Sequence, residues 1–292
     1  MANIELKDVL ALYRTPTKAE DPAIESKTIL KRIITTAGTG FPRIKTIGFL
    51  TDLALPEDDG DLHFFIETEE GADDPTTPMM VCEIQGLFKV GPDKKEDPRV
   101  KQFRQLFGRK VIVEALFRAW PEHLRDSRQP HLFEFHPVLS IGAVGEAPID
   151  FIDRVVWPTG EDPNEMARTF DAVTSPPKSL KIVSSEGRIV FQTPSKSMKR
   201  ENYVHIEGHF RGGIKKVKSG ILFDLFETPT GERSIQCFAL KGSSAYANLA
   251  TMTAGHYEIG ALCGLDLSAL LVGDPTWRTQ VSPVLEIKKL SD

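Results

Sequence analysis

The feature that most constrains this chain is a correspondence between its two halves. From Ile44 the sequence reads IKTIGFLTDLALPEDDGDLHFFIET, and from Tyr203 it reads YVHIEGHFRGGIKKVKSGILFDLFET. Each is an apolar-alternating run, a polar turn and a second run that ends on Glu-Thr. A third run then places Cys82 and Cys237 in matching positions, and both halves close on Pro-Val-Leu. The shared order predicts a duplicated domain, with two unrelated β-rich domains as the alternative.

Within each half the pattern favours strands. Residues 203–210 alternate apolar and polar side chains, which is the period of a half-buried strand. A short helical segment follows the third run, ending at Gly108 in one half and Gly255 in the other. The order is therefore three strands, a helix and two strands. By this order and length, both halves resemble the OB fold, a five-stranded Greek-key barrel. The predicted fold class is mostly β, with two OB-like barrels, short helices and internal duplication.

The expected division of the chain follows from these runs. It comprises an N-terminal helical segment (1–43), barrel 1 (44–143), a proline-containing connector (144–177) and barrel 2 (178–292). The connector is expected to hold one helix around residues 164–172. Residues 181–191 predict a hairpin that turns at Ser-Glu-Gly, and this hairpin is expected to add strands to barrel 2.

Composition narrows the class of protein. The formal net charge of −5 excludes a globally basic protein that coats nucleic acid. Three widely spaced cysteines without a CxxC pair argue against a disulfide framework and a thiolate zinc site. No signal-peptide pattern is present, and no apolar run reaches the ~18 residues of a membrane span. We therefore expect a reduced, cytoplasmic protein without a membrane segment.

Charge is divided unevenly along the chain. Residues 51–80 contain ten acids and no Lys or Arg, whereas residues 178–220 contain ten bases and three acids. Residues 211–218 are expected in the loop between the first two strands of barrel 2. The resemblance implies that this loop, with the face of the second and third strands, binds oligonucleotides or oligosaccharides.

Single-strand binding needs cations for phosphates and aromatic rings for stacking bases. The predicted nucleic-acid-binding residues are Lys196, Lys199, Arg200, Arg211, Lys215, Lys216, Lys218, Phe226 and Phe238. The alternative is that the aromatic rings fill the barrel and the lysines form a solvated turn.

Histidines and carboxylates raise a metal hypothesis. His205, Glu207 and His209 project from one strand face and offer a three-ligand site, but an exposed strand has the same spacing. No metal is therefore assigned. The acidic loop 57–61 lacks the ligand spacing of an EF-hand and is expected to be solvated. The histidines that flank an Arg-rich loop are expected at the surface; they are His123, His131 and His136.

No catalytic motif is found. The sequence has no P-loop, no dinucleotide-binding glycine pattern, no HExxH and no GxSxG, and Cys263 lies in an apolar strand where it is expected to be buried. No catalytic residue and no cofactor are predicted. The predicted function is non-catalytic binding of single-stranded DNA or RNA, mainly by barrel 2. The alternative is an assembly module whose barrels bind protein partners or copies of themselves.

Overall fold

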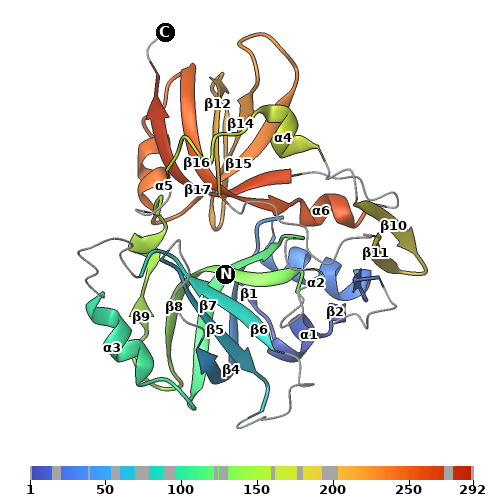
Figure 1. Cartoon of the computed structure of the whole chain (residues 1–292), viewed down its shortest axis with the longest axis vertical. Helices are drawn as coiled ribbons and strands as arrows, with labels where there is room; N and C mark the ends of the chain where they lie inside the picture. Colours follow the sequence, from blue (N-terminus) through green and yellow to red (C-terminus); the bar gives the residue numbers. More distant parts are fainter. Residues whose placement is uncertain are drawn as a thin grey trace.

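The computed structural model describes residues 2–14, 21–38, 40–53, 60–69, 79–87, 97–121, 124, 131–158, 162–175, 180–192, 203–272 and 279–290. Two closed β-barrels dominate it, one above the other in Figure 1. The prediction of a mostly β protein with two OB-like barrels is confirmed. Within the described residues, no helix is both long enough and apolar enough to cross a membrane.

Barrel 1 has the strand order of an OB fold. Its elements are β4 (Arg43–Leu53), β5 (Leu62–Glu67), β6 (Met80–Ile84), α3 (Pro98–Arg104), β7 (Lys110–Ala119) and β8 (Phe133–Ala143). The strands follow the order β4-β5-β6-β8-β7, and β7 pairs again with β4, which closes the ring. β6 and β8 run parallel, and the other pairs of the ring are antiparallel.

Barrel 2 repeats this order. Its elements are β12 (Tyr203–Phe210), β13 (Ile214–Val217), β14 (Gly220–Phe226), β15 (Ser234–Leu240), α5 (Ser244–Leu249), β16 (Gly255–Leu265), α6 (Leu267–Leu270) and β17 (Thr279–Lys289). β12 pairs with β16 along its whole length and meets β14 only at its end, whereas β13 continues alongside β14. β12 and β13 are therefore the two halves of one bent strand. The bend falls at Gly212 and Gly213, whose φ values of 85° and 87° suit glycine.

This bend corrects one expectation. Residues 211–218 are not a loop between the first two barrel strands, because Ile214–Val217 form β13. The connection to β14 is instead the short turn at Lys218 and Ser219.

The register makes the two barrels equivalent strand for strand. Cys82 lies between Phe64 of β5 and Phe135 of β8, and Cys237 lies between Phe223 of β14 and Val281 of β17. The alignment of the two cysteines therefore holds in space. The Glu-Thr match of the sequence is one residue out of register, because counting from these pairs makes Glu67 equivalent to Phe226.

The segment before barrel 1 is helical, as predicted, with α1 (Leu6–Leu10) and α2 (Lys27–Ala37). β1 (Ala2–Asn3) adds to barrel 1 beside β4. β2 (Tyr13–Arg14) and β3 (Ala23–Ile24) form a small sheet with the hairpin of β10 (Lys181–Ser185) and β11 (Arg188–Gln192). The expectation that this hairpin joins barrel 2 is wrong. The ring of barrel 2 closes on itself, and β11 instead pairs with β3, where Phe191 is buried.

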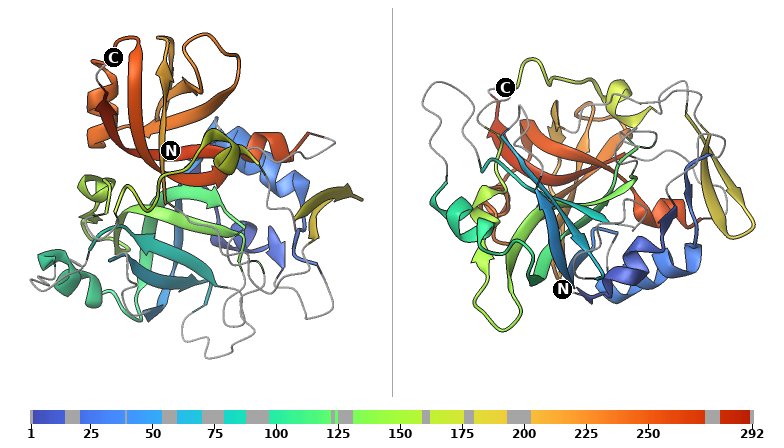
Figure 2. Two further views of the ribbon diagram at one scale, coloured as in Figure 1. Left: turned by 45° about the horizontal axis from the view of Figure 1, so that its top comes forward. Right: turned by 60° about the horizontal axis from the view of Figure 1, so that its bottom comes forward.

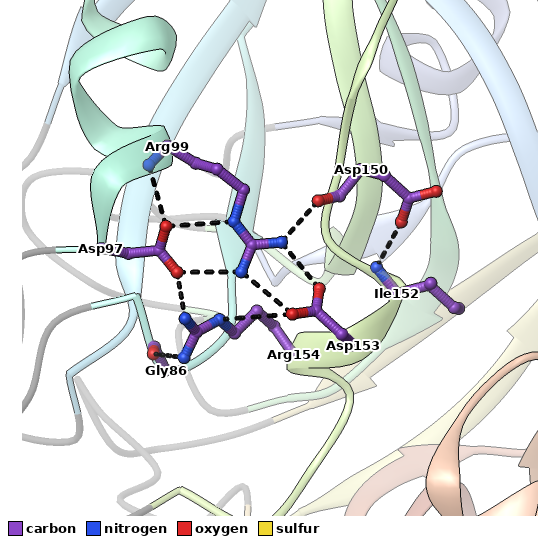
Figure 3. Close-up of polar contacts among 7 residues, drawn as sticks. All are labelled: Gly86, Asp97, Arg99, Asp150, Ile152, Asp153 and Arg154. Atoms are coloured by element: carbon purple, nitrogen blue, oxygen red, sulfur yellow. Dashed lines mark hydrogen bonds and ion pairs between the residues drawn. The ribbon is translucent and has the colours of Figure 1, made fainter.

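The connector begins with β9 (Ile149–Asp150) and a 3₁₀ turn (Ile152–Arg154), and its helix α4 (Phe170–Thr174) lies later than predicted. Figure 3 shows how the connector is attached to α3: Asp97 caps the helix and binds both Arg99 and Arg154, while Arg99 reaches Asp153 at 2.7 Å. The hydrogen bonds from Arg99 lower the pKa of Asp97 to about 2. Figure 2 shows α3 and the N-terminal helices on opposite sides of barrel 1.

An apolar cluster joins the two barrels and the connector. It contains Phe41, Leu116, Leu139, Val155, Tyr203, Phe238, Leu240, Leu262 and Leu285. Barrel 1 contributes Leu116 and Leu139, and the segment just before β4 contributes Phe41. Barrel 2 contributes Phe238 and Leu240 from β15, so the cluster is an interface between the two barrels. This interface covers part of the surface of each barrel.

Candidate nucleic-acid interface

Four of the predicted cations lie along the β13–β14 hairpin of barrel 2, with Arg211 at the end near Phe226 and Lys218 at the other end. Arg211 follows β12, Lys215 and Lys216 lie on β13, and Lys218 lies in the turn before β14; all four are exposed. The three lysines form no ion pair with any residue that the structure describes. The other predicted cations, Lys196, Lys199 and Arg200, lie outside the described residues.

Arg211 is held in place by the hairpin next to it. Its guanidinium lies 3.8 Å from the ring centroid of Phe226, and it donates hydrogen bonds to the carbonyls of Thr228, at 2.8 Å, and Gly231. Phe226 is half-buried, with one face of its ring covered by this cation. A nucleic-acid base at this point would therefore meet the guanidinium plane, which also stacks on bases.

Phe238 is not an open stacking residue, which corrects the prediction. It does share the outer face of β15 with the exposed Gln236, as the strand alternation requires. However, Phe238 is fully buried, and its ring stacks on Phe41 with centroids 4.7 Å apart. The segment leading into β4 thus covers this end of the face. The open end carries Asp224, Phe226, Ser234 and Gln236.

One further cation was missed in the sequence. Lys241 is exposed and lies just after β15, outside the basic segment 178–220. Its backbone N–H donates to the carbonyl of Ser219 at 2.9 Å, so it lies beside the turn that carries Lys218. The pairing of β14 with β15 explains the position of Lys241. Because Gly220 pairs with Leu240, the residue that follows β15, Lys241, lies opposite Ser219 in the turn.

The His205, Glu207 and His209 set does not form a metal site. The three residues lie on one strand, but each finds its partner on β16. His205 lies 3.5 Å from Glu258, Glu207 lies 3.7 Å from His256, and His209 stacks on His256 with centroids 4.6 Å apart. Among the described residues, ligand-type atoms gather within 4.8 Å of one another at a different place, formed by Asp61, Glu83 and His136.

That second place is a buried polar network on the outer face of barrel 1. His136 is 1% exposed, so the expectation of a surface histidine is wrong; both faces of β8 are buried at this point. His131 is also largely covered, and His123 lies outside the described residues. The cover over His136 includes Tyr203 at the start of barrel 2, whose hydroxyl donates to Asp61 at 2.7 Å.

The imidazole of His136 lies between two buried carboxylates. Glu83 lies 2.6 Å from Nδ1 of His136, and Asp61 lies 3.5 Å from Nε2 on the other side of the ring. Burial lowers the pKa of His136, but the charge of Glu83 and the hydrogen bonds with Glu134 and Glu83 together outweigh burial and raise the pKa to about 10. All three groups have partners within the chain, because Glu83 contacts His136 and Tyr203 donates to Asp61. We therefore assign no metal here.

Arg118 connects this network to barrel 2. Its guanidinium binds Glu134 through Nε, at 2.6 Å, and through Nη2. Its Nη1 donates to the backbone carbonyl of Cys263 on β16 at 2.9 Å. Cys263 is buried, as predicted.

The two barrels therefore present different faces. By register, Glu83 of barrel 1 is equivalent to Phe238 of barrel 2, and His136 is equivalent to Ser282. In barrel 1 this face is closed and carries paired charges. In barrel 2 the end that holds Asp224 and Gln236 is open and lies beside β13, whose lysines form no ion pair with a described residue.

Two solved structures are weakly similar to this chain. Fission yeast Pot1, solved with ssDNA, is 8% identical, with a TM-score of 0.24 over 86% of this chain and 84% of that chain. The asparaginyl-tRNA synthetase of Entamoeba histolytica, solved with asparaginyl-adenylate, is 11% identical, with a TM-score of 0.23 over 77% and 52%. No protein-family model matches, and no curated protein matches in sequence. The chain is a protein of two OB-like barrels, and this assignment rests on strand order and closure.

Proposed function

We propose that this protein binds single-stranded nucleic acid without catalysis, through the β13–β14 hairpin of barrel 2. The observation that carries the proposal is a row of exposed lysines (Lys215, Lys216 and Lys218) that starts near the Arg211–Phe226 stack and follows the β13–β14 hairpin, and none of the three forms an ion pair with a described residue. A cation with a carboxylate partner gives up that partner when it binds phosphate. These lysines have none among the described residues, so they are available for phosphate at no such cost.

Stacking favours a single strand over a duplex. The Arg211–Phe226 stack offers a flat surface at the outer face, and only unpaired bases expose their rings to such a surface. The lysines on β13 and in the following turn would then run along the phosphates of the same strand. Barrel 1 supports this division of roles, because the residues equivalent to Asp224 and Gln236 are Phe65 and Val81, and both are buried.

The test is fluorescence anisotropy with a labelled single strand and with the corresponding duplex, in DNA and RNA form. We expect salt-dependent binding to the single strand and weaker binding to the duplex. Changing Lys215, Lys216 and Lys218 together to Glu should weaken single-strand binding by tenfold or more, on the order of the loss of several phosphate contacts.

A matched control changes the same total charge elsewhere. Lys31 on α2, Lys101 on α3 and Lys181 on β10 are exposed lysines on other elements. Their combined change to Glu should cost much less affinity. An equal loss in both triple variants, or no binding by the wild type, would refute the proposal. A stable oligomer without nucleic-acid affinity, seen by light scattering, would favour the assembly alternative.

A further inference from the structure

The open face of barrel 2 contains two polar side chains with no partner. Asp224 on β14 and Gln236 on β15 lie directly opposite each other on the outer face, and both are exposed. Neither side chain has a hydrogen bond or ion pair with another residue in the described ranges. The neighbours on the same strand, Leu222 and Phe226, lie roughly 6.6 Å away on either side.

The surroundings leave room above this pair. On the β15 side the face continues to Ser234, a small residue opposite Phe226. On the β13 side, Ile214 pairs with Phe223, which places Gly213 opposite Asp224. Because glycine has no side chain, Gly213 does not cover Asp224. A Cβ added at Gly212 or Gly213 would meet nothing within 4 Å. Asp224 and Gln236 thus form the floor of a shelf between the Arg211–Phe226 stack and Lys215.

A carboxylate at this place is unfavourable for phosphate. It lies among the cations proposed to bind the backbone, yet no cation of the described residues neutralises it. Burial raises the pKa of Asp224, so the carboxylate is already partly removed from water. A neutral partner with N–H donors can form hydrogen bonds with this carboxylate without the electrostatic repulsion that a phosphate would meet.

We infer that Asp224 and Gln236 read the hydrogen-bonding edge of one base, favouring guanine and disfavouring thymine and uracil. The inference rests on the proposed function. A carboxylate only accepts, and a Gln amide both donates and accepts. The edge of guanine offers two adjacent N–H donors to Asp224 and one carbonyl to Gln236. Thymine and uracil offer a single N–H between two carbonyls, whose oxygens repel the carboxylate.

The test compares short single strands of about ten nucleotides that differ at one central base. The background is a thymine tract, and the central base is guanine, adenine, cytosine, thymine or hypoxanthine, which lacks the amino group of guanine. We expect guanine to bind about 5- to 100-fold more tightly than thymine, with hypoxanthine in between.

Two variants separate base reading from charge. Asp224→Asn removes the acceptor pair, so it should strengthen binding to the thymine tract and abolish the preference for guanine. Glu286→Gln removes the same charge from an exposed position on β17 and should keep the preference. Equal binding of all bases by the wild type, or an unchanged guanine preference in Asp224→Asn, would overturn this inference and leave the proposed function standing. Failure of every strand to bind would overturn both.

Discussion

Replacing Arg118 with methionine would remove a buried ion pair of barrel 1 and the hydrogen bond by which Arg118 reaches barrel 2. In the wild type, Arg118 is 5% exposed, binds Glu134 through two nitrogens and donates to the Cys263 carbonyl. Methionine fills much of the same volume, so the main loss is charge rather than packing. Glu134, which is 2% exposed, would be left without its strongest partner.

The expected loss of stability is large. Breaking a buried ion pair by removing one partner costs about 3–5 kcal/mol, because the other charge stays buried. The matched control is Lys288→Met, which breaks an exposed pair with Glu258 at 3.0 Å and should cost less than about 1 kcal/mol. The assay is urea unfolding followed by tryptophan fluorescence, since Trp157 packs against Tyr203 at the barrel interface.

The pH dependence gives a second readout. Burial raises the pKa of Glu134, but the charge of Arg118 together with His131 and His136 outweighs burial and holds the pKa well below its usual range. A depressed carboxyl pKa contributes stability above the unfolded pKa of about 4.3, and this contribution is lost as the pH falls. The difference between wild type and Arg118→Met should therefore persist from pH 7 down to about pH 4.3 and shrink as the pH falls further towards the lowered pKa of Glu134. A difference below about 1 kcal/mol, or one that does not change with pH, would refute the reasoning.

Three further predictions concern single sites. Phe238→Ala should destabilise the protein by about 3–5 kcal/mol in urea unfolding, and Phe226→Ala by much less, because only Phe238 is fully buried. Asp97→Asn should lower stability at pH 7, and the difference should vanish as the pH falls through the Asp97 pKa of about 2, where the wild-type carboxyl is also protonated. Cys82 and Cys237 should resist a thiol reagent in the native state and react in denaturant, because burial raises both thiol pKa values; rapid native labelling would contradict their positions.

The barrel architecture is readable from the sequence because strand alternation and element order are local properties. The same locality explains why the cysteine match holds in space. The Glu-Thr match fails by one residue because the register between two strands is set by the turn that joins them. Local alternation also places Phe238 correctly on the outer face of its strand.

The covered positions were not predictable in this way. Phe238 is buried because Phe41, far away in the chain, stacks on it, and His136 is buried because the start of barrel 2 lies against it. Both contacts belong to the packing of one barrel on the other. No pattern within a single strand reports which part of its outer face a second domain will cover, so the open and closed ends of the faces emerge only from the tertiary structure.

The central claim is that the lysines of β13 and its turn bind phosphates, and its most direct measurement is the slope of log affinity against log salt concentration for a single strand. Each phosphate contact on a single strand contributes roughly −0.7 to this slope. The account predicts that the combined change of Lys215, Lys216 and Lys218 to Glu makes the slope shallower by about 2. The control changes at Lys31, Lys101 and Lys181 should leave it unchanged. Identical slopes for the wild type and the β13 variant would contradict the account.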